Sequence, residues 1–119
     1  MRLDRLKAFA LARPQTTVVR QWGECLVFKV AGRMFLLLAL DGEVIDGVIV
    51  KCTPEEFDAL TAIDGIAQAP YCAKRMWVRI EGEALPEAGL RRCIRRSHDL
   101  VVARLPKRIQ SGLAAGTKP

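Results

Sequence analysis

The residues with the clearest capacity for chemistry in this sequence are basic. Four arginines, Arg91, Arg92, Arg95 and Arg96, fall on one side of a helical wheel, opposite a row of apolar side chains. Guanidinium groups match the geometry of phosphate oxygens, and thirteen of the nineteen basic residues are arginine. With a net charge of +6, this composition favours a polyanionic partner such as nucleic acid, although solvated arginine faces also occur without one.

A second basic group lies in a stretch that also holds aromatic residues. Lys74, Arg75 and Arg79 are interleaved with Tyr71 and Trp77. This pattern can hold a phosphate backbone while a base stacks on a ring. It is also typical of a sheet edge whose aromatic side chains point inward and whose charges are solvated, so both interpretations stay open.

Three further residues complete the predicted interface. Lys29 and Arg33 flank the tip of a predicted hairpin and could form a wing that contacts nucleic acid. Trp22 is either a core side chain or a platform on which a base stacks. The predicted nucleic-acid contacts are Lys29, Arg33, Lys74, Arg75, Arg79, Arg91, Arg92, Arg95 and Arg96, with Trp22, Tyr71 and Trp77 as stacking residues.

The sequence Ser97-His98-Asp99 contains the residue types of a catalytic triad. Consecutive helical residues point about 100° apart, so these three side chains cannot line up as nucleophile, base and orienter. The sequence also has no phosphate-cradling glycine loop and no paired carboxylates at a recognisable spacing. We therefore predict no catalytic residues and no enzymatic activity.

The cysteines do not indicate a metal site. Cys25, Cys52, Cys72 and Cys93 lie far apart, without a CxxC spacing, and His98 is the one histidine that could assist them. A disulfide framework would suit a smaller secreted chain. We expect small buried thiols, and we predict neither a metal nor a cofactor.

Length and hydropathy favour one domain in the cytoplasm. The chain has 119 residues, which is enough for a single core, and no apolar run approaches the roughly 20 residues that cross a bilayer. The N-terminal stretch lacks the long apolar run of a secretory signal. We predict one domain over residues 1–108, followed by a flexible tail over residues 109–119 that is rich in glycine and alanine.

The elements that position these residues centre on an apolar hairpin. Strands are predicted over Leu26–Val30 and Arg33–Leu40, and the two residues between them suit a tight turn. From Met34 to Leu40 the apolar residues do not alternate, which is typical of a strand covered on both faces. We expect helices on one face and further protein, such as a partner subunit, on the other.

Other elements flank this hairpin on both sides. The strongest local signal is a capping box, in which Thr53 caps a helix and Glu56 reaches back to it, with Pro54 in the first turn. The expected helices are Arg2–Arg13, Pro54–Ile63 and Pro86–Leu105, and the expected strands are Thr16–Gln21, Val44–Cys52, with a bulge or turn at Asp46-Gly47, and Met76–Glu81.

Several separated motifs resemble the MmcQ/YjbR family of small bacterial proteins. They are WG at positions 22–23, followed by LVFKVAGRMFLLL, VKCTPEEF, APYCAKRMWV and SHDLVVARLPKR, in that order. The similarity extends from the first helix to Arg108. The matching residues include Trp22, Gly23, Lys29, Gly32, Lys51, Tyr71, Lys74, Arg75, Trp77, Ser97, Asp99 and Leu100–Leu105.

The resemblance implies a fold and a partner. The implied fold is α+β and similar to frataxin (CyaY-like), an antiparallel sheet with terminal helices packed on one face. Members of the family are described as DNA-binding proteins with a double-wing arrangement. Frataxins handle iron through acidic ridges, because a hard cation prefers carboxylate oxygens, whereas the first helix here has a single acid, Asp4. Iron handling is therefore not expected.

Together these observations predict a non-enzymatic protein that binds DNA through its phosphate backbone. The alternative is a protein-interaction or homodimerisation module with no nucleic-acid role, in which the apolar strand Met34–Leu40 forms the interface. No membrane partner is expected.

Overall fold

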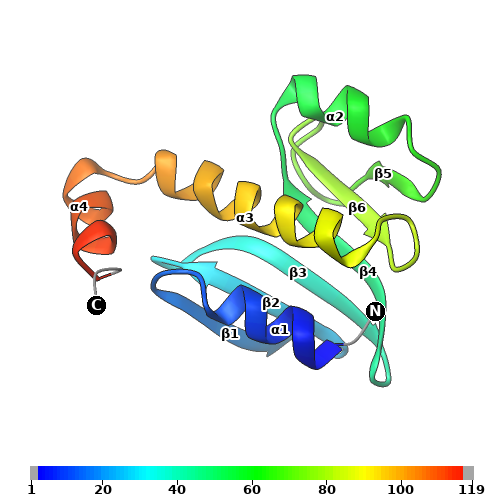
Figure 1. Ribbon diagram of the computed structural model, residues 1–119, viewed down its shortest axis with the longest axis horizontal. Helices are drawn as coiled ribbons and strands as arrows, with labels where there is room; N and C mark the ends of the chain where they lie inside the picture. Colours follow the sequence, from blue (N-terminus) through cyan, green and yellow to red (C-terminus); the bar gives the residue numbers. More distant parts are fainter. Residues whose placement is uncertain (1–2, 117–119) are drawn as a thin grey trace.

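The computed structural model of the protein describes the backbone of residues 3–116 and the side chains of residues 3–112. This part of the chain forms four helices and six strands, whose arrangement is shown in Figure 1. In chain order they are α1 (Leu3–Leu11), β1 (Thr16–Gln21), β2 (Cys25–Val30), β3 (Arg33–Asp41), β4 (Val44–Lys51), α2 (Pro54–Thr61), β5 (Ile66–Gln68), β6 (Trp77–Glu81), α3 (Glu87–Ala103) and α4 (Lys107–Gly116).

The six strands form one antiparallel sheet in the order β1-β2-β3-β4-β6-β5. Helices α1 and α3 cover one face of this sheet, and α2 lies at the β5–β6 end (Figure 1). The helix-covered face holds the main core, in which Leu6 of α1 and Leu90 and Ile94 of α3 are fully buried. The predicted α+β fold, with terminal helices on one face of an antiparallel sheet, is confirmed.

The central hairpin forms as predicted. Strands β2 and β3 are joined by Ala31 and Gly32, whose φ angles are 49° and 78°. Two residues with positive φ make the type of tight turn whose twist matches that of the flanking strands. The turn therefore sets the β2–β3 register, which brings Lys29 opposite Met34.

Strand β3 loses its alternation because of a bulge. Phe28 pairs with Leu36 and Lys29 pairs with Met34, so Phe35 is an extra residue without a partner in β2. As a result both Phe35 and Leu36 belong to the helix-side core.

The opposite face of the sheet is covered in part by the same chain. Val27, Leu37 and Ile49 form a second, smaller core there with Ala69, and Trp77 packs against it. We expected further protein, such as a partner subunit, to cover this face of the sheet. The segment between β5 and β6 of the same chain covers part of it. We call this side of the sheet the helix-free face.

Two other local predictions are confirmed. In the capping box before α2, the Thr53 side chain accepts a hydrogen bond from the Glu56 N–H at 3.2 Å, and the Glu56 carboxylate accepts one from the Thr53 N–H at 2.9 Å. In β4, the register shifts between Gly47 and Ile45, which makes Asp46 the bulged residue.

Two elements were not predicted. Strand β5 has three residues and too little pattern to detect, and its segment was expected to be a loop. Residues 109–116, which we expected in a flexible tail, lie in α4, whereas residues 117–119 lie outside the described part of the chain. The Gln110 amide donates to the Leu105 carbonyl at 2.6 Å, and Ile109 packs against the main core, so tertiary contacts support this helix.

No helix within residues 3–116 combines the length and the hydropathy needed to span a membrane.

Candidate nucleic-acid interface

Two of the four predicted arginines on α3 are engaged by carboxylates. Arg91 Nη2 lies 2.9 Å from Glu87 Oε2, which also binds Arg5 at 2.9 Å. Arg96 Nε donates to Glu56 Oε2 at 2.9 Å. Although such partly exposed ion pairs are weak, a phosphate would have to displace the carboxylate before it could bind either guanidinium in the same way.

The other two arginines of α3 lie in mixed surroundings. The Arg95 guanidinium stands 5.7 Å from the centre of the Phe9 ring on α1. Arg92 and Arg95 also line a hollow of about 500 Å³ between α2 and α3, whose walls include the acidic residues Glu56 and Asp99. The α3 arginines therefore divide between the flanks facing α1 and α2, and they do not form a uniformly cationic face.

The basic residues of the Tyr71–Arg79 stretch are also partly neutralised. Arg75 makes a two-pronged ion pair with Asp58 of α2, at 2.9 and 3.0 Å. Arg79 reaches Asp46 at the β4 bulge, at 2.9 Å. Lys74 is exposed and forms no ion pair with the described residues, so it keeps a charge that a partner can reach.

A compact cluster of free cations lies elsewhere, where β3 begins and where β4 and α3 end. Its members are Arg33, Lys51 and Arg104, which we call the basic cluster. They line a hollow of about 240 Å³. None of the three forms an ion pair with a carboxylate in the described part of the chain.

The electrostatics of the basic cluster are unfavourable without a bound anion. Burial lowers the pKa of Lys51 below its usual value of 10.5, and the positive charges of Arg104 and Arg33 lower it further. Like charges this close repel each other, and nothing described in the fold compensates them. An oxyanion in the hollow would supply the missing negative charge.

The three predicted stacking residues differ in how far their side chains are exposed. Trp77 is half-buried and lines the same hollow as the basic cluster, with Met34 beside it. Trp22 is 72% exposed and Tyr71 is fully exposed. Trp22 therefore is not the core side chain that its sequence context allowed, and both exposed rings are accessible to a ligand.

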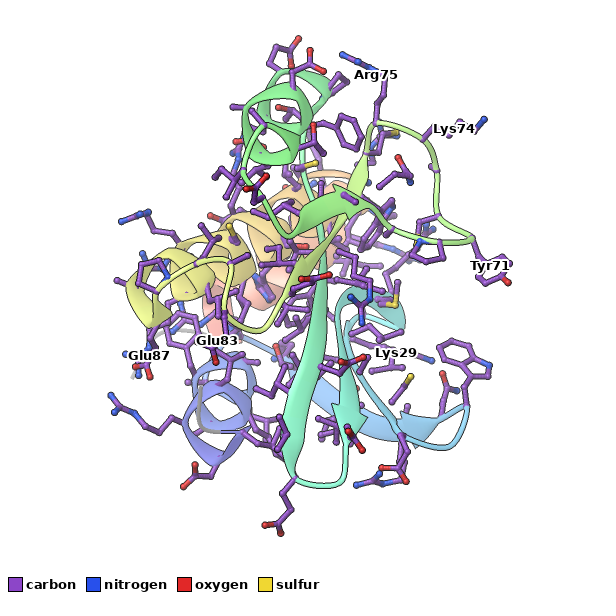
Figure 2. The ribbon with its side chains drawn as sticks, turned by 90° about the vertical axis from the view of Figure 1, so that its right-hand side faces the viewer. Lys29, Tyr71, Lys74, Arg75, Glu83 and Glu87 are labelled. Atoms are coloured by element: carbon purple, nitrogen blue, oxygen red, sulfur yellow. The ribbon has the colours of Figure 1, made fainter. Side chains whose placement is uncertain are left out.

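Basic side chains lie on both sides of the sheet, but on the side of α1 and α3 several of them are paired with carboxylates. Figure 2 shows Lys29, Tyr71 and Lys74 projecting on the helix-free side of the sheet, whereas Glu83 and Glu87 lie on the side of α1 and α3. The start of α3, where Glu87 pairs with Arg5 and Arg91, is therefore less favourable for a polyanion than the helix-free face or its edge.

Comparison with known proteins places this chain in a family. Its sequence matches YjbR over residues 11–100. The chain belongs to the YjbR family. The resemblance inferred from the separated motifs is thus confirmed. No curated protein matches the sequence significantly.

Solved structures share the fold of this YjbR chain. A Deinococcus radiodurans protein with a DUF419 domain has a TM-score of 0.81 and 22% identity, and the match covers 99% of this chain and 96% of that one. A Pseudomonas syringae protein has a TM-score of 0.69 and 18% identity, with 84% of this chain and 98% of that one covered. At these identities the likeness concerns the fold alone.

In this YjbR chain, two residues of the apparent triad, Ser97 and His98, have backbone partners. The Ser97 hydroxyl accepts a hydrogen bond from the Lys51 N–H at 2.8 Å and donates to the Phe35 carbonyl at 2.6 Å. The His98 ring donates through Nε2 to the Pro14 carbonyl at 3.1 Å and meets the Phe35 ring edge-on. Both side chains are buried and connect α3 to other elements.

The buried histidine predicts a pH dependence of stability. Burial lowers the pKa of His98 below its usual 6.5; the hydrogen bond to Pro14 and the charge of Asp99 oppose this shift, and the charge of Arg13 adds to it. Below about pH 6.5 the unfolded chain therefore binds a proton that the folded protein does not. The free energy of unfolding should accordingly decrease as the pH is lowered from about 6.5. Urea unfolding at several pH values measures this slope.

The variant His98→Gln provides the control for this prediction. Glutamine keeps a donor for the Pro14 carbonyl but does not titrate, so its unfolding free energy should depend less on pH over the same range. Equal slopes for the two proteins would show that His98 does not cause the effect.

Three of the cysteines, Cys52, Cys72 and Cys93, lie in environments that disfavour the thiolate. Burial raises the pKa of Cys52 to about 11, and it also raises the pKa values of Cys72 and Cys93. Among the described residues, no three side chains of the metal-binding types come together.

Proposed function

We propose that this YjbR-family protein binds nucleic acid through its phosphate backbone, and that the basic cluster of Arg33, Lys51 and Arg104 makes the central contact. The observation that supports this most is the convergence of three cations, free of carboxylates in the described part of the chain, on one hollow. A phosphate group placed there would relieve the repulsion among them and accept hydrogen bonds from two guanidinium groups.

A polymeric partner suits the wider charge distribution better than a small anion. Lys107 and Arg108 follow the cluster at the start of α4, and both are exposed. Lys29 lies opposite Met34, which lines the hollow, and its side chain projects on the helix-free side (Figure 2). Successive phosphates could thus meet successive cations along this edge.

The remaining predicted residues take a smaller part in this proposal. Lys74, Arg92 and Arg95 form no ion pair with the described carboxylates and could add peripheral contacts. The weaker candidates, each already bound by an acidic side chain, are Arg75, Arg79, Arg91 and Arg96. The proposed function requires no catalytic residue and no cofactor.

Salt dependence of DNA binding tests this proposal. We would measure the anisotropy of a labelled oligonucleotide at several salt concentrations, for the wild type and for Arg33→Gln/Arg104→Gln. Each phosphate contact contributes about −0.9 to the slope of log K against log salt for duplex DNA and about −0.7 for a single strand. The double variant removes two contacts and should therefore flatten the slope by about 1.4–1.8 and weaken binding at least ten-fold.

A matched control makes the same change in charge at two arginines that already form ion pairs with carboxylates. The variant Arg91→Gln/Arg96→Gln also removes two positive charges, but from side chains bound to Glu87 and Glu56. Its slope should stay close to that of the wild type. If both variants lose the same affinity, the effect is one of net charge, and the assignment of the contact to the basic cluster fails.

A further inference from the structure

A second hollow lies on the helix-free face, beside the basic cluster. It has a volume of about 600 Å³ and an almost wholly apolar lining. Leu37 and Ile49 of the smaller core lie among its walls, and the exposed rings of Trp22 and Tyr71 come to it from two different loops. Tyr71 projects from this side of the molecule in Figure 2.

Both of these aromatic residues have an unusual backbone conformation. Trp22 has a φ of 50° and Tyr71 has a φ of 61°, in the left-handed region that bulky side chains rarely adopt. This conformation is unfavourable for an L residue with a Cβ atom, and the exposed rings bury too little surface to repay its cost. The same conformation occurs at Gln15, Ala31 and Arg75, and at Trp22 it belongs to a turn in which Gly23 follows with a φ of 75°. The exposure of two large rings beside one hollow, and not the strain, therefore points to a role for the rings themselves.

The two hollows share a wall. Met34 lines both the apolar hollow and the hollow of the basic cluster. Lys29 is paired with Met34 across β2 and β3, so the two side chains lie on the same face. A ligand that occupies both hollows must therefore combine a flat apolar group with an anionic group.

A nucleotide unit within a nucleic-acid strand has this combination. We infer that the apolar hollow receives an unstacked base of single-stranded nucleic acid, with Trp22 and Tyr71 as stacking partners, while a phosphate of the same strand lies on the basic cluster. In a duplex each base is stacked on both faces and paired at its edge, so it is not available to the hollow. This inference rests on the proposed function and specifies its partner.

An abasic strand separates the two hollows experimentally. We would compare the affinity of labelled oligothymidine, an abasic oligonucleotide of equal length and a duplex, all at low salt. Oligothymidine should bind about ten-fold more tightly than the abasic strand, because base stacking on aromatic side chains adds to the phosphate contacts. The fluorescence of Trp22, measured in a Trp77→Phe background, should be quenched by oligothymidine and not by the abasic strand.

Asparagine variants remove the rings and leave the backbone undisturbed. Asparagine tolerates positive φ, so Trp22→Asn/Tyr71→Asn should fold normally, lose the preference for oligothymidine and keep the affinity for the abasic strand. Trp22→Tyr should retain most of the preference. Val44→Ala removes another exposed apolar side chain, which does not line the hollow, and should have no effect.

The possible outcomes distinguish the inference from the proposed function. If oligothymidine and the abasic strand bind equally and both bind less to Arg33→Gln/Arg104→Gln, the phosphate site stands and the base site is excluded. If no strand responds to the arginine variant, both fail. If sedimentation shows a dimer that Trp22→Asn/Tyr71→Asn dissociates, the hollow is occupied by a second copy of the chain, and the base site is likewise excluded.

Discussion

Replacing Ser97 by alanine should lower the free energy of unfolding by about 2–4 kcal/mol, although it removes one oxygen atom. The regular β3–β4 pairing ends where Leu36 faces Val50, and one further step would place Phe35 opposite Lys51. The Ser97 hydroxyl occupies that place in the ladder, with the N–H of one strand as donor and the carbonyl of the other as acceptor. Alanine leaves both backbone groups without a partner beneath α3.

Chemical denaturation and amide hydrogen exchange would measure this effect. In Ser97→Ala the denaturation midpoint should fall, and the amide of Lys51 should lose its protection selectively, because Ser97 is its acceptor. Ser111→Ala, at an exposed position of α4, should change stability by less than about 0.5 kcal/mol. If Ser97→Ala lost as little stability as Ser111→Ala, a water molecule would have to replace the hydroxyl between the two backbone groups.

This hydrogen bond also links the fold to the proposed site. Lys51 is the central member of the basic cluster, and Ser97 fixes its backbone at the end of β4. Phe35, the acceptor of the same hydroxyl, is the bulged residue of β3 and lies two positions from Arg33. A serine that sequence analysis considers as part of a triad thus acts as a connector between two strands that carry the cations.

Local signals predicted the elements, because their causes lie within a few residues. The β2–β3 turn depends on Ala31 and Gly32 alone, and the start of α2 depends on Thr53, Pro54 and Glu56. Strand β5 and helix α4 escaped prediction for the opposite reason. The first has three residues, and the second depends on contacts that Ile109 and Gln110 make with distant parts of the chain.

The candidate site depended on tertiary contacts that no local pattern contains. A helical wheel shows Arg91 and Arg96 on one face, but it cannot show that Glu56, on another helix, binds Arg96. Asp58 and Asp46 neutralise Arg75 and Arg79 in the same way, from elements remote in sequence. Counting basic residues therefore overestimates the positive charge that a partner can reach.

The same limit concealed the basic cluster. Arg33, Lys51 and Arg104 are far apart in the sequence, and only Arg33 was predicted as a contact. Lys51 has no basic residue near it in the sequence, and Arg104 lies outside the run of four arginines that drew attention to α3. The informative property is the lack of a carboxylate partner among the described residues, which appears only when the ends of β4 and α3 and the start of β3 are assembled.

Replacing Gly82 by alanine should destabilise the protein by about 2–3 kcal/mol. A Cβ atom at this position would stand 2.7 Å from the carbonyl oxygen of Ile45, a backbone atom that cannot rotate away. Gly82 directly follows Glu81, the last residue of β6, and Ile45 directly precedes the bulged Asp46 in β4. The bulge thus requires a residue without a side chain where the two strands separate.

Gly112→Ala is the matched control for this prediction. Gly112 lies in α4, and a Cβ atom added there would meet no described atom within 4 Å, so alanine should stabilise the helix by about 0.5–1 kcal/mol. The two substitutions add the same methyl group and should shift the thermal midpoint in opposite directions. If Gly82→Ala were as stable as the wild type, β4 and β6 would be free to move apart at the bulge. The ion pair of Arg79 with Asp46, which spans the same place, would then have to tolerate that movement.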